Sequence, residues 1–203
     1  MLEDDHSHDD VNAGGLEALM RRADGLGKTP PVEKWNPEFC GDIDMRIAAN
    51  GLWYYMGTPI GREPLVRLFA SVLRKDEDGK HYLVTPVEKI GITVDDAPFV
   101  GVELHAAGSG KDQIITLRTN VGEAMDIGPD HPMRFEPEPE TDGVKPYVMV
   151  RGRLEALCLR SLLYELVEIG GEEDVDGDVW FGVWSSGIFY PMMLAEELRR
   201  LSQ

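Results

Sequence analysis

Residues 46–69, RIAANGLWYYMGTPIGREPLVRLF, contain the signals that decide the fold. The segments on either side of Asn50 and Gly51, IDMRIAA and LWYYM, have the period-two pattern of strands, and Asn-Gly is a preferred dipeptide for a tight hairpin turn. Apolar residues then return at helical spacing, at Leu65, Leu68, Phe69, Val72 and Leu73. The stretch therefore predicts a β-hairpin followed by an amphipathic helix, which is a structural module and not an enzyme motif.

The second half of the chain repeats this pattern. QIITLRTNVGEAMDIG, residues 113–128, aligns with DMRIAANGLWYYMG, residues 44–57, so that Gly122 matches Gly51. Further on, VMVRGRLEALCLRSLLYELV, residues 148–167, resembles PIGREPLVRLFASVL, residues 59–73, and predicts a second helix that starts near Arg153. We therefore expect an α+β protein of two tandem repeats, each with a β-hairpin, a helix and further strands.

The repeat pattern predicts that the chain has three segments. Residues 1–34 form an acidic tail, an amphipathic helix and a proline-rich linker, residues 35–110 form the first repeat, and residues 111–203 form the second repeat with a C-terminal helix. Short helices are thus expected at both ends of the chain, in GGLEALMRRADGLG and in LAEELRRLSQ.

The charge balance argues against several classes of partner. The chain has 20 Lys and Arg residues against 37 Asp and Glu residues, a net charge of −17. A field of this sign repels nucleic acids and anionic membrane surfaces. No stretch is apolar enough to cross a membrane, and the N-terminus has no apolar signal core. We expect a cytoplasmic protein with no nucleic-acid or membrane partner.

The Gly-Arg doublets at Arg62 and Arg153 are the strongest candidate binding residues. Each is expected at the start of a helix, where unpaired backbone N–H groups, the helix dipole and a guanidinium together attract an anion. Arg151 adds a further positive charge in the second half. The structural alternative is that these arginines form ion pairs with the many carboxylates of the chain.

Other candidates carry weaker signals. Trp53 and Tyr55, on one face of a strand, could stack on a ligand, although an aromatic cluster of this kind is more often core. Asp126 and His131 lie in one loop segment, DIGPDHP, and could serve acid–base chemistry, although a polar surface loop explains them as well.

Motifs for cofactors, metals and nucleophiles are incomplete. GSGK, residues 108–111, lacks the full phosphate-loop pattern and is interpreted as a hairpin turn. GVWSSG, residues 182–187, is not a nucleophile motif and indicates a turn or close packing at a strand end. No pair of metal ligands has usable spacing. We therefore expect no cofactor and no metal.

Three strings resemble the bacterial family called domain of unknown function 1285: RIAANGLWYYMGTPIGREPLVRLFASVL, HYLVTPVEKIGITVDDAPF and PYVMVRGRLEALCLRSLLYELVE. The resemblance covers about residues 35–190. It implies a two-repeat α+β protein and suggests a role in signal transduction. It implies no catalytic residues.

These observations favour a non-catalytic module that binds a small anionic ligand or a protein partner. Two alternatives stay open. One is a hydrolase-type enzyme that uses the loop of Asp126 and His131. The other is a structural module that forms homo-oligomers through its amphipathic end helices.

Overall fold

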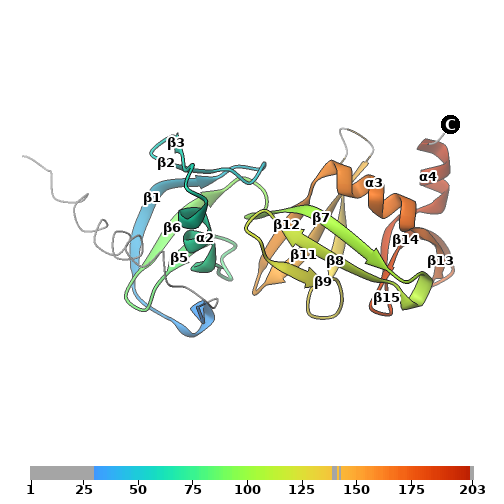
Figure 1. Cartoon of the computed structure of the whole chain (residues 1–203), viewed down its shortest axis with the longest axis horizontal. Helices are drawn as coiled ribbons and strands as arrows, with labels where there is room; N and C mark the ends of the chain where they lie inside the picture. Colours follow the sequence, from blue (N-terminus) through green and yellow to red (C-terminus); the bar gives the residue numbers. More distant parts are fainter. Residues whose placement is uncertain (1–29, 139–140, 142, 202–203) are drawn as a thin grey trace, which may run out of the picture. The chain divides into compact units, whose positions relative to one another are not determined.

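The computed structural model describes residues 30–138, 141 and 143–201, and it divides the chain into two compact units, Met1–Asp95 and Asp96–Gln203 (Figure 1). The sequence placed this boundary after residue 110. The structure places it earlier because β7 (Phe99–Ala107) pairs with β8 and β12 of the second unit. The amphipathic helix expected in residues 14–27 lies outside the described residues.

The first unit contains a six-stranded mixed sheet in the order β3-β2-β1-β6-β5-β4. Its central strands β1 and β6 are parallel, and all other pairs are antiparallel. The helix α2 connects β3 to β4. The elements are η1 (Val32–Lys34), β1 (Phe39–Ile47), β2 (Trp53–Tyr55), β3 (Thr58–Pro59), α2 (Glu63–Ser71), β4 (Leu73–Lys75), β5 (His81–Val84) and β6 (Lys89–Val94).

The predicted hairpin and the helix that follows it are both present. Gly51 has a φ of 80°, a value that favours glycine, and the Asn50 side chain accepts a 3.1 Å hydrogen bond from the Leu52 amide. The apolar face of α2 places Phe69 against Trp53, with ring centroids 6.1 Å apart, and both residues are fully buried. This contact joins the helix to the sheet within the first core.

The second unit contains a six-stranded sheet with the same plan, in the order β10-β11-β12-β7-β8-β9. In both sheets the chain forms two three-stranded meanders, and the first strand of the first meander lies parallel to the last strand of the second. The fold class is therefore α+β with two similar mixed sheets, each accompanied by a helix. The elements are β7, η2 (Gly110–Asp112), β8 (Ile114–Thr119), β9 (Ala124–Asp126), β10 (Met133–Glu138), β11 (Gly143–Arg151), β12 (Leu154–Cys158) and α3 (Arg160–Ile169).

The second helix begins later than predicted, at Arg160 and not near Arg153. Residues 154–158, LEALC, form β12, and Gly152 and Arg153 form the turn before it, with a φ of 54° at Gly152. Leucine, alanine and glutamate are good helix formers, but the alternating burial of LEALC and its pairing with β11 and β7 make it a strand. As a result α3 follows the sixth strand of its sheet, whereas α2 lies between the third and fourth, so the two helices are not equivalent.

The glycine turns match only locally. The Gly51 amide donates to the Ala48 carbonyl, as the Gly122 amide donates to the Thr119 carbonyl. However, the Gly51 turn joins the first and second strands of its sheet, whereas the Gly122 turn joins the second and third. The alignment of the two halves is therefore displaced by one strand.

A three-stranded sheet and a short helix complete the second unit. The sheet has the order β13-β14-β15, with β13 (Gly171–Val175), β14 (Asp178–Ser185), β15 (Ile188–Leu194) and then α4 (Ala195–Leu201). The GVWSSG segment closes the β14–β15 hairpin, and its Ser185 is fully buried. This confirms that the segment marks a turn and close packing. Within the described parts of the chain, no helix is long and apolar enough to span a membrane.

Candidate functional site

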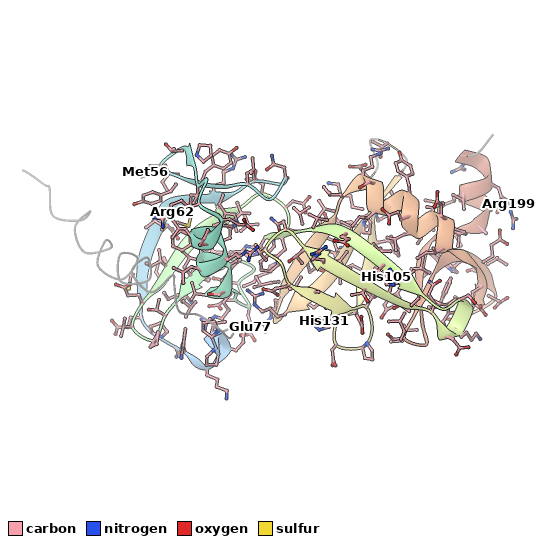
Figure 2. All side chains as sticks on the ribbon, in the orientation of Figure 1. Met56, Arg62, Glu77, His105, His131 and Arg199 are labelled. Atoms are coloured by element: carbon pink, nitrogen blue, oxygen red, sulfur yellow. The ribbon has the colours of Figure 1, made fainter. Side chains whose placement is uncertain are left out.

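Arg62, the first of the candidate anion-binding residues, lies where the sequence placed it. It is the N-cap residue of α2 and is exposed (Figure 2). Among the residues that the structure describes, its side chain has no hydrogen bond or ion pair. Its position at the helix start therefore agrees with the prediction.

The second doublet does not stand at a helix start, because Gly152 and Arg153 form the turn between β11 and β12. The Arg151 side chain, 20% exposed, forms an ion pair with Glu123 and lies over the Phe99 ring, 5.0 Å from its centroid. Arg151 thus fits the structural alternative of an ion pair, and the helix-end argument for Arg153 does not apply.

The two aromatic candidates on β2, Trp53 and Tyr55, differ in their exposure to solvent. Trp53 is 1% exposed and packs in the core, where it cannot stack on a ligand from solvent, whereas Tyr55 is 42% exposed. Tyr55 therefore stays a candidate, and Trp53 is a core residue.

Asp126 and His131 have separate partners. The Thr116 hydroxyl donates a 2.6 Å hydrogen bond to Asp126, and the Nδ1 atom of His131 (Figure 2) lies 3.0 Å from the Met149 carbonyl oxygen. A proton on Nδ1 makes that contact a hydrogen bond. The described residues contain no group of three or more His, Cys, Asp or Glu side chains that could hold a metal ion.

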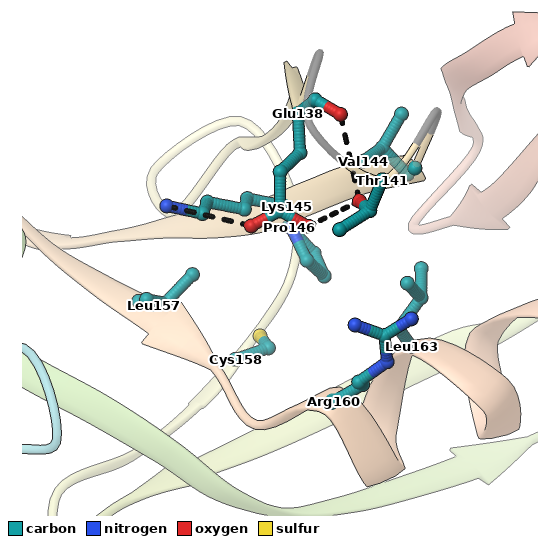
Figure 3. Close-up of a pocket in the computed structure, with 10 residues that line it drawn as sticks. Glu138, Thr141, Val144, Lys145, Pro146, Leu157, Cys158, Arg160 and Leu163 are labelled. Atoms are coloured by element: carbon teal, nitrogen blue, oxygen red, sulfur yellow. Dashed lines mark hydrogen bonds and ion pairs between the residues drawn. The ribbon is translucent and has the colours of Figure 1, made fainter.

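A pocket of about 250 Å³ lies where β10, β11, the end of β12 and the start of α3 meet (Figure 3). It combines an apolar wall with a charged rim. Its lining residues are Glu138, Thr141, Gly143, Val144, Lys145, Pro146, Leu157, Cys158, Arg160 and Leu163.

The apolar wall includes the thiol of Cys158. This residue is 4% exposed, and burial raises the pKa of its thiol to about 12. Because the thiolate is the nucleophilic form of cysteine, the neutral Cys158 serves here as a small apolar side chain.

The rim holds two cations whose partners differ. Lys145 Nζ lies 3.4 Å from Asp96 and 3.8 Å from Glu138, and Thr141 donates a 2.5 Å hydrogen bond to the same glutamate. Arg160, in contrast, forms no ion pair within the described chain. Its Nε donates a 3.3 Å hydrogen bond to the Tyr164 hydroxyl, and this bond, with a smaller effect of the Glu138 charge, raises the pKa of Arg160. Figure 3 shows its side chain extending from the start of α3 toward the strands that carry Glu138 and Lys145.

The start of α3 adds positive potential beside this arginine. Leu159 is the N-cap residue and offers no side-chain acceptor, and the first turn contains no acidic residue. A ten-residue helix with such a start leaves its dipole uncompensated. The pocket rim at Arg160 can therefore receive one negative charge.

Sequence reasoning missed Arg160 because it placed this residue inside the helix that was expected to start near Arg153. The signal that could have found it is the change from the period-two LEALC to the helical spacing of Leu162 and Leu166. That change puts the helix start at Arg160.

Fold and site together describe an α+β protein with two sheets of one plan and a ligand-sized pocket in the second. Two family models match the chain: "Domain of unknown function (DUF1285), N-terminal domain" over residues 30–97, and "Protein of unknown function (DUF1285), C-terminal domain" over residues 98–192. The chain belongs to the DUF1285 family.

Two solved structures are similar to the chain. The crystal structure of a DUF1285 family protein from Silicibacter pomeroyi DSS-3 is 50% identical, covers 90% of this chain and 98% of its own, and has a TM-score of 0.81. A DUF1285 family protein from Shewanella baltica OS155 is 26% identical over 61% of this chain and 90% of its own, with a TM-score of 0.48. No curated protein matches the chain significantly.

Proposed function

We propose that this protein is a non-catalytic module that binds a small anionic ligand in the pocket at the start of α3. The observation that carries the proposal is Arg160, a cation on the rim of an apolar pocket with no carboxylate partner in the described chain. An arginine fork beside an uncapped helix start favours a carboxylate or phosphate. A role in signal transduction, as a ligand sensor, is consistent with such a module.

The lining of the pocket supports binding more than catalysis. Its thiol is neutral and buried, and its glutamate is held by Thr141 and Lys145. The hydrolase alternative has less support, because Asp126 contacts Thr116 and His131 contacts the Met149 carbonyl.

A protein partner is the second candidate, and the surface beside the pocket favours it. Leu159 is 43% exposed and Tyr164 is 59% exposed, and both lie next to Arg160 in α3 or at its N-cap. Tyrosine and arginine are enriched among the residues that dominate protein interfaces. A partner with an acidic side chain could insert that side chain at Arg160.

A thermal-shift screen of the full chain against carboxylates, nucleotides and phosphorylated metabolites tests the proposal. We expect at least one class to stabilise the protein, and Arg160→Gln to weaken that binding by about tenfold to a hundredfold, since a charged hydrogen bond is lost. The melting temperature without ligand should be unchanged, because Arg160 is exposed.

Arg62→Gln is the matched control, because Arg62 is an exposed arginine at the start of the other helix. It should bind the same compounds as the parent does. An empty screen would overturn the proposal. So would a loss of binding in Arg62→Gln with full binding in Arg160→Gln, because the site would then lie at α2.

A further inference from the structure

The charge and shape of the same pocket also limit the class of ligand. We infer that the ligand is a monocarboxylate with a compact apolar body, and not a phosphorylated compound; this inference rests on the proposed function.

The described charges on the rim sum to zero, because Lys145 and Arg160 stand against Asp96 and Glu138. Lys145 is already shared between Asp96 and Glu138, whereas Arg160 has no carboxylate partner among the described residues. A monoanion can therefore form the ion pair that Arg160 lacks, at the cost of only one excess negative charge on the rim. A phosphate dianion would bring a second negative charge close to Glu138, and like charges at short range repel.

The field of the whole protein acts in the same direction. With a net charge of −17, the chain repels multiply charged anions more strongly than monoanions. The proteins that select phosphates usually surround them with several cations or backbone N–H groups. Among its described residues, this rim has one guanidinium without an ion pair.

The wall of the pocket selects an apolar body. Its lining includes Val144, Pro146, Leu157 and Leu163, together with the neutral thiol of Cys158. A pocket of about 250 Å³ is smaller than the sites that usually hold drug-sized ligands. A short aliphatic or single-ring carboxylate fits this volume, and burial of its carbon atoms adds to affinity.

Isothermal titration of the full chain with four probes tests the inference. The reference probe is 3-phenylpropionate. Of the other three probes, 3-phenylpropanamide lacks the negative charge, phenyl phosphate carries a second negative charge, and acetate lacks the apolar body. We expect 3-phenylpropionate to bind about tenfold or more tightly than each of the other three. Arg160→Gln should remove this preference over the amide, and Arg62→Gln should keep it.

Glu138→Gln gives a second, independent readout. Removal of this carboxylate should raise the affinity for phenyl phosphate by more than the affinity for 3-phenylpropionate, because repulsion of the second charge is relieved. An equal effect on both probes would overturn the charge argument.

The two proposals fail in different ways. If phenyl phosphate binds more tightly than 3-phenylpropionate and depends on Arg160, the pocket is an anion site but the ligand class is wrong. If the phosphorylated compounds of the thermal-shift screen bind and no carboxylate does, the same conclusion follows. If no anion of either experiment binds, the inference and the proposed function both fail.

Discussion

The Ser185 hydroxyl donates a 2.6 Å hydrogen bond to the carbonyl oxygen of Ile127, a residue 58 positions earlier in the chain. The same hydroxyl accepts a 2.9 Å hydrogen bond from the Ile115 amide. Ser185 is fully buried, and its side chain satisfies an amide of β8 and a carbonyl directly after β9 and joins them to the β14–β15 hairpin.

Ser185→Ala should therefore lower the free energy of unfolding by about 1–3 kcal/mol, since it leaves a buried amide and a buried carbonyl without this partner. Urea denaturation followed by tryptophan fluorescence measures the change. Ser186→Ala is the control. Ser186 also donates to Ile127, at 2.8 Å, but it is exposed, so its removal should cost less. Equal losses for the two variants would contradict the assigned role of Ser185.

How much of this fold the sequence could predict depends on how local its signals are. The Asn50-Gly51 hairpin and α2 were predicted because their turn residues and apolar spacing lie within one short stretch. The residues of LEALC favour a helix locally, and the sequence therefore predicts one. The segment is a strand because it pairs with β7, which lies more than fifty residues away. Local propensity contains no information about that pairing.

The candidate pocket could not be predicted from the sequence for the same reason. It brings Glu138 and Lys145, on the β10–β11 hairpin, together with Arg160 on α3, and this arrangement exists only once the sheet order is known. The structural ion pair of Arg151, in contrast, was anticipated as an alternative, because a strongly acidic chain offers each arginine many carboxylates.

His81 should make the first unit less stable at mildly acidic pH. Burial lowers the pKa of this residue to about 4, and the nearby Lys75 acts in the same direction. Its side chain is 8% exposed, and its Nε2 has no hydrogen-bond partner within the described chain. Its contribution to stability is complete above about pH 6.5, and it is lost as the pH falls toward 4, because the unfolded chain binds a proton that the folded chain excludes.

The change across this window should be on the order of 3 kcal/mol. His81→Leu should flatten the pH dependence of hydrogen exchange in β5 between pH 4 and 6.5. His105→Leu should not, because His105 is exposed on β7 (Figure 2). An identical pH slope in the parent and in His81→Leu would show that other groups cause the dependence.

Arg74 should hold the segment around η1 onto the first sheet. It is 7% exposed, and it donates hydrogen bonds of 2.9 Å to the Val32 carbonyl and 2.7 Å to the Trp35 carbonyl. It also pairs with Asp76, at 2.5 Å. Arg74→Met should cost about 3 kcal/mol, because two carbonyls and a half-buried carboxylate lose a charged partner.

Hydrogen exchange at residues 32–37 measures this effect directly, since these amides should exchange faster in Arg74→Met. Arg67→Met is the control, because within the described residues Arg67 forms only an exposed pair with Glu63 on α2. Its effect should stay within about 0.5 kcal/mol. Unchanged exchange at residues 32–37 in Arg74→Met would mean that other contacts hold this segment.

Loss of Arg151 should destabilise the protein more than loss of Arg153, although the two arginines are only two positions apart, at the end of β11 and in the turn after it. Arg151 pairs with Glu123 and covers the Phe99 ring, whereas Arg153 is exposed. Arg151→Ala should therefore lower the free energy of unfolding by about 1–2 kcal/mol, and Arg153→Ala should change it by less than about 0.5 kcal/mol.

A double-mutant cycle of Arg151→Ala with Glu123→Gln, read by urea denaturation, separates the ion pair from the ring contact, since only the ion pair gives a coupling energy. Arg151→Lys should keep part of the coupling but lose the planar contact with Phe99. If Arg153→Ala destabilises the protein and Arg151→Ala does not, the structural role belongs to the exposed arginine, and the anion-binding prediction for Arg151 regains its support.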